Sequence, residues 1–220
     1  MKTNEKHLQE LTEIRNLMEK SSRFLSLSGL SGISAGIIAI AGALAVWIFT
    51  AMGDIRYDEY YRTLSGREDM NVLRFIVIDA FLVLILAIGS GLYFSSRRAM
   101  KMGIPFWNSA SKRLLMNLLI PLGTGGMICI ILLFRNGLNL VAPLMLVFYG
   151  LALINAGKYT QYNINYLGIT EILTGILAMI FIQYSLYFWT IGFGLWHILY
   201  GSIFYFRYEK ANQKYNTPEK

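Results

Sequence analysis

Residues 73–95 read LRFIVIDAFLVLILAIGSGLYFS, a run in which only Arg74 and Asp79 are charged. An α-helix needs about 20 consecutive apolar residues to cross the hydrocarbon core of a bilayer. In lipid the backbone polar groups must be paired internally, and a single apolar segment can pair them only as a helix. This run therefore predicts a membrane-spanning helix.

The same pattern returns along the whole chain. The 220 residues are 55% hydrophobic and 15% charged, whereas a soluble domain carries about 25% charged residues. We expect an all-α fold, a polytopic membrane helix bundle whose domain covers residues 23–207 and leaves no room for a separate soluble domain. The six predicted transmembrane helices are 26–49, 73–95, 114–134, 138–156, 164–183 and 187–206.

The net charge of +7 is distributed unevenly between the two sides of these spans. Of the 20 Lys and Arg residues, fifteen precede the first span, lie in the connections 96–113 and 157–163, or follow the sixth span. Basic residues concentrate on the cytoplasmic side of membrane proteins. We therefore predict that both termini are cytoplasmic, with the lipid bilayer as partner and no nucleic acid bound directly. The other five are Arg56, Arg62, Arg67, Arg74 and Arg135.

The segments outside the spans are short. Residues 1–22 predict a cytoplasmic amphipathic helix, because apolar residues recur at helical spacing with Glu and Lys opposite. Its balanced charge fits a cytoplasmic protein partner, or the rest of this chain, better than a membrane surface. Residues 208–220 are expected to form a cytoplasmic tail. The apolar positions of the first segment are Leu8, Leu11, Ile14 and Met18.

Two stretches in the last third follow one template, GITEILTG (168–175) and GLWHILYG (194–201). Positions i, i+3 and i+7 share a helix face, so each ionisable residue lies on a stripe between two glycines. The connection at 183–185 is short and predicts a helical hairpin. In that hairpin Glu171 and His197 are level, and we expect the two glycine stripes to face each other.

An unpaired charge in the membrane costs about 3 kcal/mol or more. Glu171 and His197 therefore either share a proton or are each neutral and bonded to Thr174, Tyr200 or backbone. The pair is a ligand- or proton-binding candidate, and a purely structural hydrogen bond is the other interpretation. Asp79 is a third intramembrane acid with the same two interpretations.

The third predicted span contains IPLGTGGM. Proline removes a backbone donor and clashes one turn back, and clustered glycine loosens a helix further. Two forms are open: a kinked helix, or a discontinuous helix of the kind that exposes backbone to a transported ligand. The candidate break residues are Pro121, Gly123, Gly125 and Gly126.

Motifs of catalysis and metal binding are absent from the sequence. There is no HExxH, GxSxG or Walker loop, and the single cysteine, Cys129, has no partner for a disulfide or a cysteine-based metal site. We expect no metal and no cofactor, and a protein that is not an enzyme.

Several segments taken together resemble an uncharacterised family of bacterial six-span inner-membrane proteins: EIRNLMEKSSRFLSLSGLSGISAG, KRLLMNLLIPLGTGG, LVAPLMLVFYGLALINAGKYT, YLGITEILTG and GFGLWHILYG. The resemblance covers nearly the whole chain. It implies the bacterial cytoplasmic membrane as location and implies no particular activity.

We expect a sensory or regulatory membrane protein with Glu171 and His197 as polar core or small-ligand site. The alternative is a small proton- or ion-coupled transporter that uses Glu171, His197 and Asp79 with the interrupted third span, and a lipid-modifying enzyme is a weaker third option. A homo-oligomer stays open.

Overall fold

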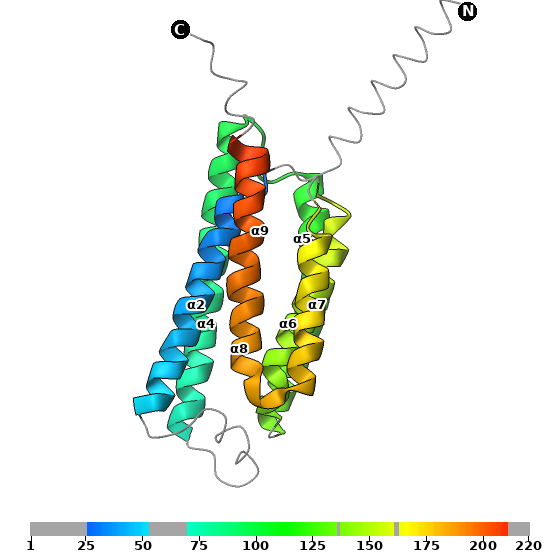
Figure 1. Cartoon of the computed structure of the whole chain (residues 1–220). Coiled ribbons are helices and arrows are strands. Elements are labelled where there is room, and N and C mark those ends of the chain that lie inside the picture. The colour runs from blue at the N-terminus through cyan, green and yellow to red at the C-terminus, as the bar shows by residue number, and fades with distance from the viewer. Residues whose placement is uncertain (1–25, 53–69, 136, 161–162, 211–220) are drawn as a thin grey trace, which may run out of the picture.

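The computed structural model describes residues 26–52, 70–135, 137–160 and 163–210. The predicted amphipathic helix 1–22 and residues 211–220 lie outside these ranges. The described chain is all-α and forms six helical rods (Figure 1). The first five are α2 (Gly29–Met52), α4 (Met70–Lys101), α5 (Ser109–Phe134), α6 (Leu138–Gly157) and α7 (Asn165–Ile180).

The sixth rod consists of consecutive helical segments with two different geometries. After the short 3₁₀ turn η1 (Ile182–Tyr184), α8 (Ser185–Trp189) leads into the π-helix η2 (Thr190–Trp196). α9 (His197–Phe204) and a second π-helix, η3 (Tyr205–Lys210), complete it. The helical rod thus continues three residues into the segment 208–220 that was predicted to be a tail.

Four described helices are long and apolar enough to cross a membrane: Gly29–Met52, Asn71–Lys101, Ser109–Phe134 and Leu138–Gly157. α7 has 16 residues and, at about 1.5 Å per residue, is shorter than the hydrocarbon core. The sixth rod is divided between α- and π-helix. The structure therefore shows a multi-pass helical membrane protein with four candidate spans, fewer than the six predicted.

Large apolar side chains cover the outside of these helices. Leu86 of α4 and Met127 of α5 are 57% and 62% exposed. Such surfaces are costly in water and favourable in lipid, so the exposure identifies these faces as contacts with the bilayer.

The helices form two groups (Figure 1). In the first group α2 packs against α4 and α9, and in the second α6 packs against α5 and α7. α8 lies against α6 and α7 of the second group, and η2 contacts both α2 of the first group and α7 of the second, so this part of the sixth rod connects the two groups. At the end of the bundle where α4 and α6 begin, Val72 and Leu138 form a small apolar core between the groups.

Glycines allow the backbones to touch within each group. A Cβ built on Gly201 of α9 would lie 2.6 Å from the carbonyl oxygen of Gly29 in α2. A Cβ on Gly150 of α6 would lie 2.5 Å from the carbonyl oxygen of Gly168 in α7. These helices approach more closely than any side chain at these positions would allow.

The two glycine stripes do not face each other, and that prediction was wrong. Gly168 and Gly175 of α7 lie against α6, whereas Gly194 and Gly201 of the sixth rod lie against α2. The hairpin geometry determines which residues of the two helices lie at the same height. It does not determine which helix each stripe packs against, and the stripe of α7 packs on α6 whereas the stripe of the sixth rod packs on α2.

Candidate functional site

A buried polar cluster joins the two groups of helices. It consists of Glu171 from α7, Tyr149 from α6 and His197 at the start of α9. Glu171 is completely buried and His197 is 6% exposed. The structure thus brings together the two ionisable residues of the glycine motifs and adds a tyrosine that the sequence analysis missed.

His197 is the centre of this cluster. Its Nε2 lies 2.8 Å from the hydroxyl oxygen of Tyr149. Its Nδ1 lies 3.1 Å from the carbonyl oxygen of Gly192 and 3.3 Å from Oε1 of Glu171. Every ring nitrogen is therefore engaged, and one of them faces the carboxyl group.

These contacts fix the proton positions on the ring. A carbonyl oxygen can only accept a hydrogen bond, so Nδ1 of His197 carries a hydrogen that it donates to Gly192. When the ring is neutral, Nε2 is an acceptor and the Tyr149 hydroxyl donates to it. A second proton on the ring would reverse that bond, with Nε2–H donating to the tyrosine oxygen.

Glu171 is less well satisfied than its neighbours. Neither carboxyl oxygen accepts a hydrogen bond in the described part of the chain, although Nδ1 of His197 is at ion-pair distance. A buried, ionised carboxylate without hydrogen bonds is strongly unfavourable. Glu171 is therefore either protonated or balanced by a protonated His197, and in both cases the pair holds one exchangeable proton.

Gly192 leaves space for the carboxyl group of Glu171. A Cβ on Gly192 would lie 2.6 Å from Oε2 of Glu171 and would overlap the side chain of Leu146, so a larger residue here would displace the carboxyl group or the leucine. Gly192 lies in the π-helix η2, a geometry that is rare and concentrated at functional sites.

Aromatic rings enclose the cluster. The ring centroid of Phe193 is 5.1 Å from that of Tyr149 and 6.0 Å from that of His197. These rings lower the local polarity, and a low dielectric strengthens every interaction of the buried pair.

The other predicted polar residues lie elsewhere. Thr174 accepts a hydrogen bond from Nε1 of Trp196 at 3.1 Å, a second contact between α7 and the sixth rod. Tyr200 packs beside the apolar core around Leu153 and Leu167. Asp79 lies on α4, where its Oδ2 would be 3.1 Å from a Cβ on Gly42 of α2. It thus belongs to the α2–α4 contact and not to the buried cluster.

The helix-break candidates lie in a helix that is continuous. α5 runs without interruption through Pro121, so the discontinuous form is wrong. Proline has no N–H to donate one turn back, and the carbonyl oxygen of Asn117 instead accepts a hydrogen bond from Nδ2 of Asn155 in α6 at 2.9 Å. Gly125 packs against Phe148 of α6, whereas among the described residues no neighbouring helix comes within 4 Å of a Cβ on Gly123 or Gly126.

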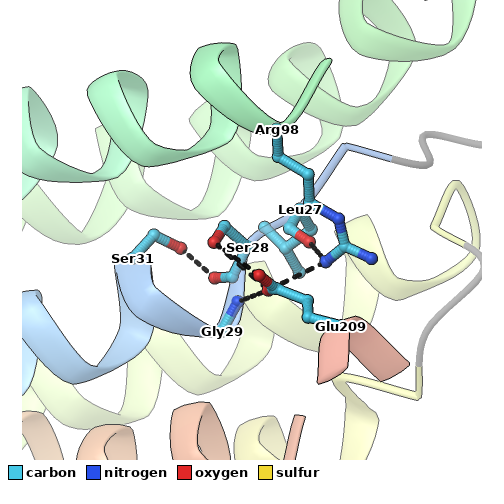
Figure 2. A network of polar contacts seen from close by, with 6 residues as sticks. All are labelled: Leu27, Ser28, Gly29, Ser31, Arg98 and Glu209. Atoms are coloured by element: carbon cyan, nitrogen blue, oxygen red, sulfur yellow. Dashed lines mark hydrogen bonds and ion pairs between the residues drawn. The ribbon is translucent and has the colours of Figure 1, made fainter. Parts of the chain in front are cut away.

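A second polar network lies where α2 begins (Figure 2). Glu209 of η3 accepts hydrogen bonds from the backbone N–H of Gly29 and from the hydroxyl of Ser28, at 2.5 and 3.2 Å. Arg98 of α4 pairs with Glu209 at 3.0 Å and also donates to the carbonyl of Leu27. The carboxylate therefore caps the positive end of α2 and ties η3 to α2 and α4. We call it the Glu209 clasp.

Tyr149, Gly192 and Trp196 were missed by the sequence analysis. Two of them had a weak signal, since Tyr149 is a hydroxyl inside the apolar run LVFYGLAL and Gly192 lies five residues before His197. Neither signal indicates which helix lies against His197.

Comparisons with protein-family models, with curated proteins and with solved structures give no match. The site therefore has to be interpreted from its own chemistry.

Proposed function

We propose that this protein is a proton-responsive sensory or regulatory membrane protein without enzymatic activity, whose sensing group is the Glu171–His197 pair with Tyr149. The observation that supports it is a completely buried carboxyl group that accepts no hydrogen bond from the described residues and lies 3.3 Å from a histidine nitrogen. Ionisable residues inside membrane segments are functional candidates by default, and histidine is the side chain that titrates near neutral pH.

The proposal includes a topology of six spans with both termini in the cytoplasm of a bacterial inner membrane. The sixth rod from Ser185 to Lys210 is long enough to cross the hydrocarbon core at about 1.5 Å per residue. Basic residues support the orientation. At the end where α2 begins lie Arg97, Arg98, Lys101, Lys112, Arg113, Lys158, Arg207 and Lys210; the described part of the other end has Arg74 and Arg135.

A transporter that uses the Glu171–His197 pair is the alternative, but one argument for it no longer holds. The broken helix on which a transport site was expected is continuous. A cytoplasmic protein bound by residues 1–22 would suit a regulatory role; that segment lies outside the described ranges.

Infrared difference spectroscopy tests the proposal. Protein reconstituted in liposomes is compared at about pH 5 and pH 8, the range in which histidine titrates, for the native chain, Glu171→Gln and Asp79→Asn. We expect a pH-dependent carbonyl band of a protonated carboxyl that disappears in Glu171→Gln and remains in Asp79→Asn. An unchanged band in Glu171→Gln contradicts the proposal.

The same liposomes separate sensing from transport. Proton flux that Glu171→Gln abolishes would favour the transporter. A pH-dependent Glu171 band without flux would favour the sensor.

A further inference from the structure

Each group of helices is held together as one unit. In the first group, α2 and α9 touch through Gly29 and Gly201, and the Glu209 clasp ties α4, η3 and the start of α2 (Figure 2). In the second, α6 and α7 touch through Gly150 and Gly168, and Asn155 bonds α6 to α5. Backbone contacts and partly buried hydrogen bonds leave little freedom inside either group.

The contacts between the groups are different in kind. His197 and Trp196 of the sixth rod bond to Tyr149 of α6 and Thr174 of α7. Towards the end where α2 begins, Leu27, Trp196 and Tyr200 are only partly buried against the second group's apolar core. The opposite end is fixed by the turn 181–184 between α7 and α8 and by the core of Val72 and Leu138.

The two changes of protonation are unequal in cost. Adding a proton to the pair gives an imidazolium whose two N–H groups both have acceptors, Gly192 and the tyrosine oxygen. Removing the shared proton leaves an ionised Glu171 with no donor in the part of the chain that the structure describes, because the Nδ1 hydrogen already points to Gly192. An unpaired charge in the membrane costs about 3 kcal/mol or more, and hydration of the carboxylate would relieve it.

We propose that loss of this proton separates α7 from the sixth rod, so that the two groups swing apart at the end where α2 begins and pivot at the α7–α8 turn. Among the described groups around Glu171, the titratable ones are Tyr149 of α6 and His197 of α9; from η2 the contact is Gly192. Opening admits water to the carboxylate and exposes a new surface at that end. This inference rests on the proposed function and identifies the conformational change by which the protein would respond to loss of the proton.

Distances between spin labels test the motion. In a Cys129→Ser background, one pair of labels joins the groups at Met100 of α4 and Tyr166 of α7, which are 72% and 67% exposed. The matched control pair, Met116 of α5 and Tyr166, lies within the second group. Both pairs are measured in liposomes from about pH 5 to 8, with and without Glu171→Gln.

We expect the Met100–Tyr166 distance to lengthen by more than about 2 Å, the scale of a real rearrangement, as pH rises. The control pair should not change, and Glu171→Gln should hold the short distance throughout. Lengthening that persists in Glu171→Gln, or equal lengthening of the control pair, overturns the inference. If the infrared band shows Glu171 losing its proton while both distances stay constant, the motion is wrong and the proposed function stands. If neither Glu171 nor His197 loses a proton in this range, both are wrong.

Discussion

Substitution of Gly201 by alanine tests the contact between α2 and α9. The added Cβ would lie 2.6 Å from the carbonyl oxygen of Gly29 and 2.7 Å from the backbone nitrogen of Ile33, whereas ordinary contact begins at 3.4 Å. Because both neighbours are backbone atoms, no side chain can turn away. The two helices must separate by roughly 0.5–1 Å, a gap that forfeits a quarter to a half of the dispersion attraction around it.

We expect Gly201→Ala to lower the free energy of unfolding by about 1–3 kcal/mol, as overpacking does in other proteins. Gly126→Ala is the matched control, because no atom of the described residues beyond its own helix backbone lies within 4 Å of its Cβ and alanine gains up to about 1 kcal/mol in a helix. Unfolding by titration with denaturing detergent in mixed micelles gives both values. Equal stability of the two variants would refute the close contact between α2 and α9.

Two further predictions concern the polar contacts. Tyr149→Phe removes the hydrogen bond to Nε2 of His197 and should cost about 0.6 kcal/mol, the average for such bonds in membranes; in nitrogen NMR the Nε2 resonance should shift, and an unchanged resonance would argue against the bond. Glu209→Gln removes the charge that caps α2 and pairs with Arg98, and should cost between about 0.3 and 2 kcal/mol in detergent unfolding. The exposed Lys112→Gln serves as its control and should be neutral; a Glu209→Gln variant as stable as that control would contradict the clasp.

The sequence predicted single helices well and their partners poorly. The predicted stretch 138–156 and α6 (Leu138–Gly157) nearly coincide, because length and hydropathy decide such a segment. The sequence also predicted that Glu171 and His197 lie at the same height in the bundle, since an antiparallel hairpin determines which residues lie opposite each other. Helical periodicity shows which residues share a face, but not which neighbouring helix meets that face. The glycine stripes were therefore assigned to the wrong partners.

The remaining errors have the same origin. Pro121 was expected to weaken its helix, and no local rule shows that Asn155, 34 positions later, occupies the carbonyl that proline frees. Tyr149 lies in an apolar run, and its hydroxyl belongs to the polar cluster only because α6 passes close to His197. The π-helical segments around α9 have no recognisable signal in the sequence.

A double-mutant cycle on Glu171 and His197 measures whether the two side chains interact. The free energy of unfolding is measured in mixed micelles for the native chain, Glu171→Gln, His197→Gln and the double variant, with Asp79→Asn replacing Glu171→Gln in a control cycle. Residues in one network couple by about 0.5–3 kcal/mol. We expect coupling in that range for Glu171 and His197 and additive effects for the control cycle; additive effects of Glu171 and His197 would show that they do not form a buried pair.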